Sequence, residues 1–172
     1  MLLALVAGGA AASKPTVTVG ERAGLYDVRG EFTTSASLAT AWAVLTDYAR
    51  IDSFVTSMQH SDVQRLADGQ LRVRQVATAG VFPFHRTLHL VLDVKEDPPR
   101  RIDFVDEGGV DFERYVGAWT LRRDAAATVV GYTLDAVPRK GAPSRISRSV
   151  MRHSASELLD QVRAEMDRRT KR

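Results

Sequence analysis

The chain has 172 residues, of which 44% are hydrophobic and 26% are charged, and its formal net charge is +3. These values are typical of one soluble globular domain. The mildly basic charge permits contact with an anionic membrane or with nucleic acid but requires neither, and no nucleic-acid partner is predicted. The sequence contains no cysteine, which excludes disulfides, thiolate catalysis and cysteine-ligated metal.

Residues 1–12 have the pattern expected of an export signal. An apolar run at 2–7 is followed by three alanines at 10–12, which fit a small-residue cleavage site. The run is too short to span a bilayer. We therefore predict an exported protein, periplasmic or secreted, that matures near Ser13. A frayed apolar terminus or a short lipid-anchor helix is the alternative, and residues 13–24 are predicted to be a linker.

Hydrophobic periodicity predicts the order of the elements that follow. A strand at 25–33 precedes a helix over 38–45, capped by Ser35 or Ser37, and a short helix or turn at 48–54. A long helix, capped by Ser144 and ending near residue 168, closes the chain. Between the helices, strands separated by turn residues are predicted at 55–66, 71–79, 84–94 and 102–105, around Trp119, and at 128–137.

This order predicts an α+β fold. Strands joined by tight turns pair antiparallel, so one curved antiparallel sheet is expected to wrap around the long C-terminal helix, with two short helices after the first strand. The apolar face of such a sheet needs a cover, and the final helix is long enough to provide it. A gap between the sheet and the helix is where an apolar ligand would bind.

Strand parity places large side chains on the face expected to meet the last helix. Tyr115, Gly117 and Trp119 share one face of a strand. The glycine leaves room for a close backbone or for a bound molecule, and a filled core strand with a bulge is the alternative. The predicted ligand-binding residues are Phe84, Arg86, Leu88, Leu90, Phe104, Tyr115, Trp119 and Tyr132.

Arg86 is the charged member of this set, and its parity places it near the mouth of the cavity. A buried arginine needs an acidic partner or a ligand oxygen, because unpaired burial is costly. Asp106 is the predicted partner, and anchoring of the ligand is the alternative. The acidic residues nearby are predicted to form a solvated turn, since their spacing lacks a calcium-loop pattern: Asp103, Asp106, Glu107, Asp111 and Glu113.

The last helix carries Arg145, Arg148 and Arg152 on one predicted face. Positive charge near the start of a helix opposes the helix dipole, so these residues do not stabilise the helix. They are either a solvated face or a contact with an anionic membrane surface.

No catalytic residue, cofactor or metal site is predicted. The sequence lacks a nucleophile elbow, a phosphate-binding loop and a dinucleotide fingerprint. His85 and His89 would lie about 13 Å apart on a strand, at roughly 3.3 Å per residue, which is too far for one ion.

Two segments resemble a known family. Residues 41–55, Ala-Trp-Ala-Val-Leu-Thr-Asp-Tyr-Ala-Arg-Ile-Asp-Ser-Phe-Val, resemble the start of START-like (SRPBCC) helix-grip proteins, in particular the bacterial polyketide cyclase/dehydrase and coenzyme Q-binding branch. The late strand with Phe112, Tyr115, Gly117, Trp119 and Leu121 is similar to that family as well. The resemblance extends over about residues 25–166.

The resemblance implies a START-like ligand-binding domain over residues 25–168 and the binding or transport of a hydrophobic, lipid-like small molecule. The alternative is a polyketide cyclase/dehydratase-type enzyme that uses the same cavity. A protein-interaction module, similar to ribosome-associated relatives, is a third interpretation. Members of the family share a fold but no chemistry. Export and the missing catalytic set favour a carrier over an enzyme.

Overall fold

Alternating apolar and polar side chains produce eight strands, which form one antiparallel sheet in this computed structural model. The structure describes residues 13–81, 84–140 and 146–171. The sheet order is β1-β2-β8-β7-β6-β5-β4-β3. The elements are β1 (Thr16–Arg22), β2 (Leu25–Thr34), α1 (Leu38–Leu45), the 3₁₀ helix η1 (Tyr48–Ser53), β3 (Met58–Arg65), β4 (Leu71–Val81), β5 (Phe84–Asp97), β6 (Arg101–Asp106), β7 (Phe112–Asp124), β8 (Ala127–Pro138) and α2 (Arg148–Thr170).

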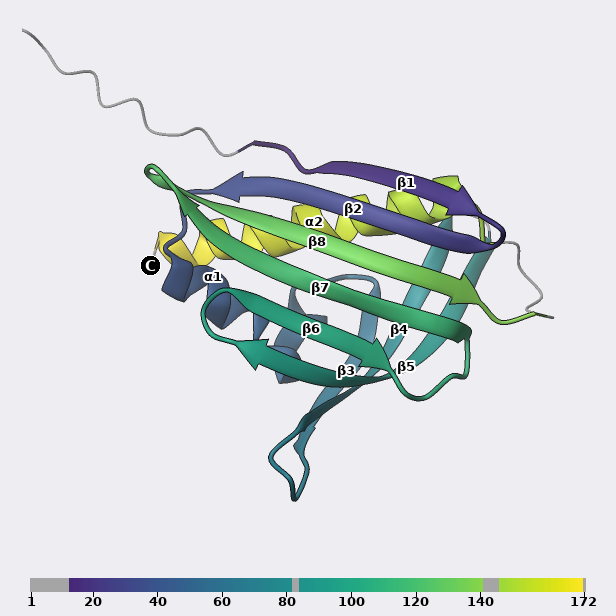
Figure 1. Cartoon of the computed structure of the whole chain (residues 1–172). Helices are drawn as coiled ribbons and strands as arrows, with labels where there is room; N and C mark the ends of the chain where they lie inside the picture. The colour runs from purple at the N-terminus through teal and green to yellow at the C-terminus, as the bar shows by residue number, and fades with distance from the viewer. Residues whose placement is uncertain (1–12, 82–83, 141–145, 172) are drawn as a thin grey trace, which may run out of the picture.

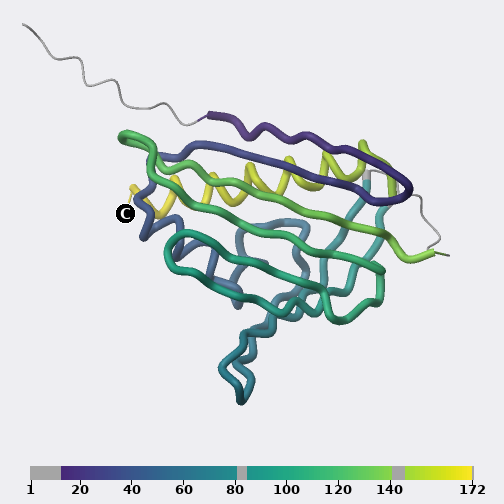
Figure 2. The backbone as a smooth tube through the Cα atoms, in the orientation of Figure 1, coloured from purple at the N-terminus to yellow at the C-terminus, as the bar shows by residue number. Residues whose placement is uncertain are grey.

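The sheet curves around α2, which crosses its concave side, and α1 lies near the C-terminal end of α2 (Figure 1). The hairpin of β3 and β4 extends beyond the rest of the sheet (Figure 2). This arrangement confirms the α+β helix-grip prediction, with the two short helices between β2 and β3. Within the described residues, no helix has both the length and the hydropathy to span a bilayer.

The prediction of a linker at residues 13–24 is wrong, because β1 occupies most of it and pairs with β2 from Thr16↔Glu31 to Arg22↔Leu25. The turn between these strands has positive φ at both Ala23 and Gly24, as a type I′ hairpin requires. Residues 1–12, the predicted export signal, lie outside the described part of the chain.

A serine hydroxyl caps the N-terminus of each α-helix, as the sequence predicts, but only the cap of α1 is at a predicted position. Ser37 caps α1 by accepting a hydrogen bond from the Thr40 amide at 3.0 Å. The cap of α2 is Ser147, which accepts from the Val150 amide at 3.3 Å, so α2 begins later than a cap at Ser144 predicts. Ser144 itself lies outside the described residues.

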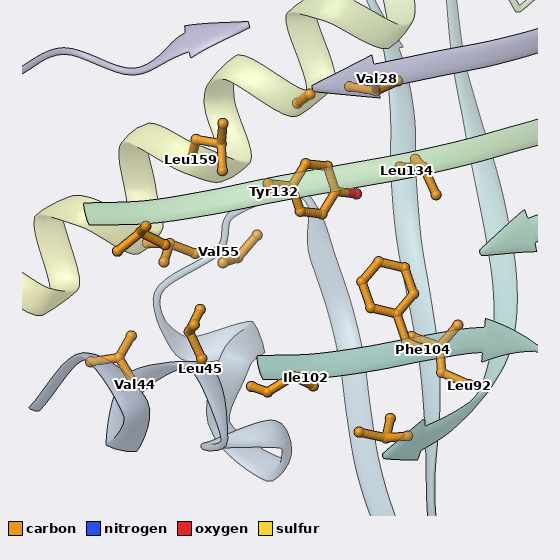
Figure 3. Packing of buried hydrophobic residues seen from close by; sticks show 14 of the residues in the cluster. Val28, Val44, Leu45, Val55, Leu92, Ile102, Phe104, Tyr132, Leu134 and Leu159 are labelled. Carbon is orange, nitrogen blue, oxygen red and sulfur yellow. The ribbon is translucent and has the colours of Figure 1, made fainter. Parts of the chain in front are cut away.

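The buried side of α2 packs on β2 around Gly30. A Cβ atom added at Gly30 would lie 2.3 Å from Cδ1 of Leu159, so the Leu159 side chain fills the space that the glycine leaves. Val28 and Phe32 flank this contact on the same face of β2. Leu159 and Val28 lie in the core between the helix and the sheet (Figure 3).

The C-terminal end of α2 is fixed by charged groups. Glu165 is buried and accepts hydrogen bonds from Arg168 and Arg169, each at 2.6 Å. Arg169 also donates to Asp47, the residue before η1, at 2.7 Å. The bond from Arg168, which outweighs the effect of burial, holds the pKa of Glu165 below its ordinary value. This end of the helix is therefore tied to η1.

Candidate functional site

A cavity of about 180 Å³ lies between the concave face of the sheet and α2. Its wall is mostly apolar, and no charged side chain contributes to it among the described residues. The polar groups in the wall are uncharged: Tyr48, Ser57, Gln75, Thr78, Tyr115, Tyr132 and Ser154. The site can therefore hold an apolar group, but the described wall offers no counter-ion for a charged one.

The structure brings six of the eight predicted binding residues together around this cavity. They come from β5, β6, β7 and β8 and are Leu88, Leu90, Phe104, Tyr115, Trp119 and Tyr132. Phe104 and Tyr132 project from neighbouring parts of the sheet towards the same interior (Figure 3). Phe84 begins β5, but its side chain lies outside the described part of the structure.

The aromatic residues form one connected cluster on the wall. The ring centroids of Trp119 and Tyr132 are 4.6 Å apart, and those of Phe112 and Tyr115 are 4.9 Å apart. Phe104 joins the two pairs, at 6.1 Å from Tyr115 and 6.3 Å from Tyr132. These separations are typical of favourable aromatic pairs, so this side of the cavity is a defined surface.

Gly117 lies beneath this cluster, and the groups nearest to it are the carbonyl oxygen of Thr133 and the ring of Phe104. A Cβ atom there would lie 2.3 Å from the carbonyl oxygen of Thr133 and 2.4 Å from the Phe104 ring. Of the two sequence interpretations, the structure favours close packing by the neighbouring strand and ring. Gly117 thus positions Phe104 in the cavity wall.

The titratable side chains of the described wall are those of three tyrosines, Tyr48, Tyr115 and Tyr132. The hydroxyls of Tyr115 and Tyr132 lie close enough for each to affect the pKa of the other. Burial raises the pKa of Tyr115 to about 12 and that of Tyr132 well above its ordinary value. Burial and a 2.7 Å hydrogen bond to Glu96 likewise raise the pKa of Tyr48. All three hydroxyls are protonated at neutral pH.

Arg86 is not among the residues that line the cavity, and the prediction of Asp106 as its partner is wrong. Its guanidinium donates instead to Asp111, which also accepts from the His89 amide at 2.7 Å. Burial favours a raised pKa for Asp111, but these two hydrogen bonds outweigh it and hold the pKa below its ordinary value. Asp106 accepts from the Val91 amide at 2.8 Å.

The acidic turn is consequently not fully solvated, because Asp111 is only 5% exposed. Its carboxylate fixes the start of β7 to β5 through Arg86 and the amide of His89. Groups of His, Asp and Glu that could hold a metal ion are absent from the described residues.

Several partly exposed residues of the cavity wall lie on β4 and at the start of α2, and we interpret this region as the mouth of the cavity. Its partly exposed wall residues there are Ala77, Ala79, Ile146, Val150 and Met151. The predicted binding set contains none of them, because they depend on how the helix crosses the sheet. Two sequence patterns could have indicated these residues: the alternation of small side chains along β4 and the apolar positions at the start of α2.

Arg148 and Arg152 are exposed at this same end of α2. The side chain of Arg148 is 64% exposed and lies 3.8 Å from Glu21, an exposed pair of small energetic value. Arg145, the third residue of the predicted basic face, precedes α2 and lies outside the described residues. The structure therefore describes two of the three predicted positions. These two residues adjoin Val150 and Met151 of the mouth.

Fold and cavity together define a helix-grip protein with an internal apolar site. The model of the family described as polyketide cyclase / dehydrase and lipid transport matches residues 34–163, and the chain belongs to that family. None of the curated proteins is significantly similar in sequence.

Solved structures share the fold at low sequence identity. The Zhui aromatase/cyclase from a Streptomyces species is 20% identical with a TM-score of 0.70, over 85% of this chain and 96% of that one. A STAR-related lipid transfer protein fragment from Xanthomonas axonopodis is 16% identical with a TM-score of 0.65, over 90% and 99%. A START superfamily protein from Mycobacterium smegmatis is 15% identical with a TM-score of 0.58, over 84% and 97%.

Proposed function

We propose that this protein binds and carries a hydrophobic, lipid-like small molecule in the cavity between the sheet and α2. The observation that carries this proposal is the composition of the wall, which is apolar and has no charged side chain among the described residues. The family includes lipid transport in its description, and a fold neighbour is a STAR-related lipid transfer protein.

The size of the cavity limits how much of the ligand it encloses. A volume of about 180 Å³ is close to that of an engineered apolar cavity of roughly 150 Å³ that binds benzene. It is smaller than the roughly 300–1,000 Å³ of sites that enclose a drug-sized ligand. We therefore propose that one ring or a short chain segment is buried and that the rest of the ligand extends through the mouth.

Native mass spectrometry of protein purified from its own host tests this function, together with extraction and identification of any retained molecule. The expected result is an added mass that extracts into organic solvent. Protein that retains nothing, and that binds no apolar probe after delipidation, would contradict the proposal.

The second candidate is an enzyme of the cyclase/dehydratase type, which the family description and the aromatase/cyclase neighbour favour. Such chemistry moves protons, and the titratable side chains of the described wall are Tyr48, Tyr115 and Tyr132. Their raised pKa values keep them protonated at neutral pH, so none is available as a general base. Conversion of a linear polyketone by the purified protein would favour the enzyme.

We further propose that the mouth docks on an anionic membrane surface through Arg148 and Arg152. Both are exposed beside the mouth residues Val150 and Met151, so docking would present the opening to lipid. Each basic residue near an anionic membrane contributes about 1 kcal/mol, and the effect falls off within a Debye length. Two such residues favour reversible docking, and Arg145 would add to it.

Vesicle binding tests this docking. Replacing Arg148 and Arg152 with Gln should weaken binding to phosphatidylserine-containing vesicles by roughly 2 kcal/mol at low salt, and added salt should weaken wild-type binding. Gln at Arg29 and Arg101, which are exposed on strands with side chains away from the cavity, is the control of equal net charge. Equal loss in both double variants, or no salt dependence, would identify a solvated face.

Export of the protein is also proposed, from the apolar run at 2–7 and the alanines at 10–12. Cleavage before Ser13 would leave the described domain complete, including β1. Ser13 is the first described residue, and its hydroxyl lies 2.9 Å from that of Thr33 on β2.

A further inference from the structure

The side chains of Tyr115 and Tyr132 offer a polar contact inside the mostly apolar cavity. Tyr115 lies opposite Ala136 in the ladder of β7 and β8, whereas Tyr132 lies opposite Trp119. The two side chains start four residues apart along β7, and both rings lie near the Phe104 ring, at centroid distances of 6.1 Å for Tyr115 and 6.3 Å for Tyr132. Both line the cavity.

The hydroxyls of Tyr115 and Tyr132 carry more protons than the described protein groups around them accept. Each tyrosine hydroxyl carries one proton, and a bond between the two hydroxyls would use at most one of the two protons. No other hydrogen bond involves either hydroxyl within the described part of the chain. One O–H therefore faces the cavity, and leaving a buried donor without an acceptor is costly.

The absence of charge in the described wall limits which ligand groups can accept a hydrogen bond from this hydroxyl. The described wall has no cationic side chain that could neutralise a bound carboxylate or phosphate. An anion taken to this depth would lose its hydration without a counter-ion. A carbonyl oxygen accepts a hydrogen bond at a much smaller desolvation cost.

We propose that the buried part of the ligand is uncharged and carries a carbonyl oxygen, as in a ketone or an ester, that accepts a hydrogen bond from the Tyr115–Tyr132 pair. This inference rests on the proposed function and names the chemical class of the ligand. A pure hydrocarbon segment would leave the spare donor unpaired, and a free acid would leave its own charge unpaired.

Three small probes of similar shape test the inference: acetophenone, ethylbenzene and benzoate, titrated into delipidated protein by calorimetry or ligand-observed NMR. Acetophenone should bind roughly fivefold more tightly than ethylbenzene, the ratio expected for one net hydrogen bond. Benzoate should bind more weakly than both. Without this hydrogen bond, the carbonyl of acetophenone would lose its hydrogen bonds to water on binding and gain none in return. Ethylbenzene should then bind more tightly than acetophenone.

The variants remove hydroxyls and keep the rings. The double variant Tyr115→Phe with Tyr132→Phe should lose the preference for acetophenone while still binding ethylbenzene, which also shows that it is folded. Each single variant leaves one hydroxyl with a free proton and should retain the preference. Tyr26→Phe is the control, because the Tyr26 hydroxyl already donates to the Ile146 carbonyl at 2.7 Å and lies outside the cavity wall.

The outcomes separate this inference from the function on which it rests. If acetophenone and ethylbenzene bind with the same ratio in wild-type protein and in the double variant, the tyrosine pair does not recognise a carbonyl, although the cavity still binds apolar molecules. Benzoate binding as tight as that of acetophenone would overturn the uncharged ligand. If no probe binds to delipidated wild-type protein, both the inference and the proposed function are wrong.

Discussion

Replacing Gly117 with Ala tests the close packing beneath the cavity. The added methyl would lie 2.3 Å from the Thr133 carbonyl oxygen and 2.4 Å from the Phe104 ring. The carbonyl belongs to β8, which is hydrogen-bonded to β7 on this side of the sheet, so it cannot move away without disturbing the ladder. The methyl must therefore displace Phe104 or distort the strands.

The magnitude follows from two opposing effects. Overpacking of a filled site costs about 1–3 kcal/mol. Replacing a glycine in a strand by alanine recovers about 0.5–1 kcal/mol of conformational free energy. The net loss in the free energy of unfolding is about 1–2 kcal/mol, which lowers the midpoint of thermal unfolding by about 2–8 °C in a protein of this size.

Urea denaturation of Gly117→Ala and Gly20→Ala measures the effect against a matched control. A Cβ atom at Gly20 would meet Cβ of Asp27 at 3.8 Å, an ordinary contact, so this variant should be as stable as the wild type or slightly more stable. Folded Gly117→Ala should also bind an apolar probe less tightly, because Phe104 is pushed towards the cavity. If Gly117→Ala is as stable as Gly20→Ala, the close packing inferred here is wrong.

Three further predictions concern the ligand, acid stability and export. Trp42→Phe should keep the change in tryptophan emission that an apolar probe causes, and Trp119→Phe should lose it, because Trp119 lines the cavity and Trp42 does not; equal responses would count against this. Because the pKa of Asp111 is lowered by folding, its stabilising contribution is present above the unfolded value of about 3.9 and is lost as the pH falls through the folded value. Asp111→Asn should therefore flatten the decline in stability below about pH 4, and an unchanged decline would refute the assignment. The intact mass of protein from the native host should correspond to a chain that begins near Ser13, whereas a retained segment 1–12 would contradict export.

The strands that could be predicted are those with strong alternation and standard turn residues. Asp68 and Gly69 indicate the hairpin of β3 and β4, and the structure has it, with a loop that spans residues 66–70. β1 could not be recognised in the same way. It is an edge strand in which Val19 is the one buried residue, and its turn has Ala23 where asparagine or aspartate is usual. Packing against β2 overrides that weak local preference.

The candidate site shows a similar division. Parity along one strand follows from the geometry of the chain, so Leu88, Leu90 and Trp119 could be placed on the cavity side. Contacts from loops could not be predicted, because a loop has no fixed register. For this reason the sequence could not show that Arg86 pairs with Asp111 instead of Asp106. The mouth residues of β4 and α2 were missed for another reason, because they depend on how the helix crosses the sheet.

The two ends of α2 differ in a way that bears on how a ligand enters. At the C-terminal end, Glu165 and Arg169 join the helix to η1 through short hydrogen bonds. At the N-terminal end, Val150 and Met151 are partly exposed apolar residues of the mouth. Regions with few buried contacts open at the lowest free-energy cost. Widening of the mouth by movement of this end of the helix would admit a ligand larger than the cavity of about 180 Å³, at the cost of the hydrogen bond from Tyr26 to the Ile146 carbonyl.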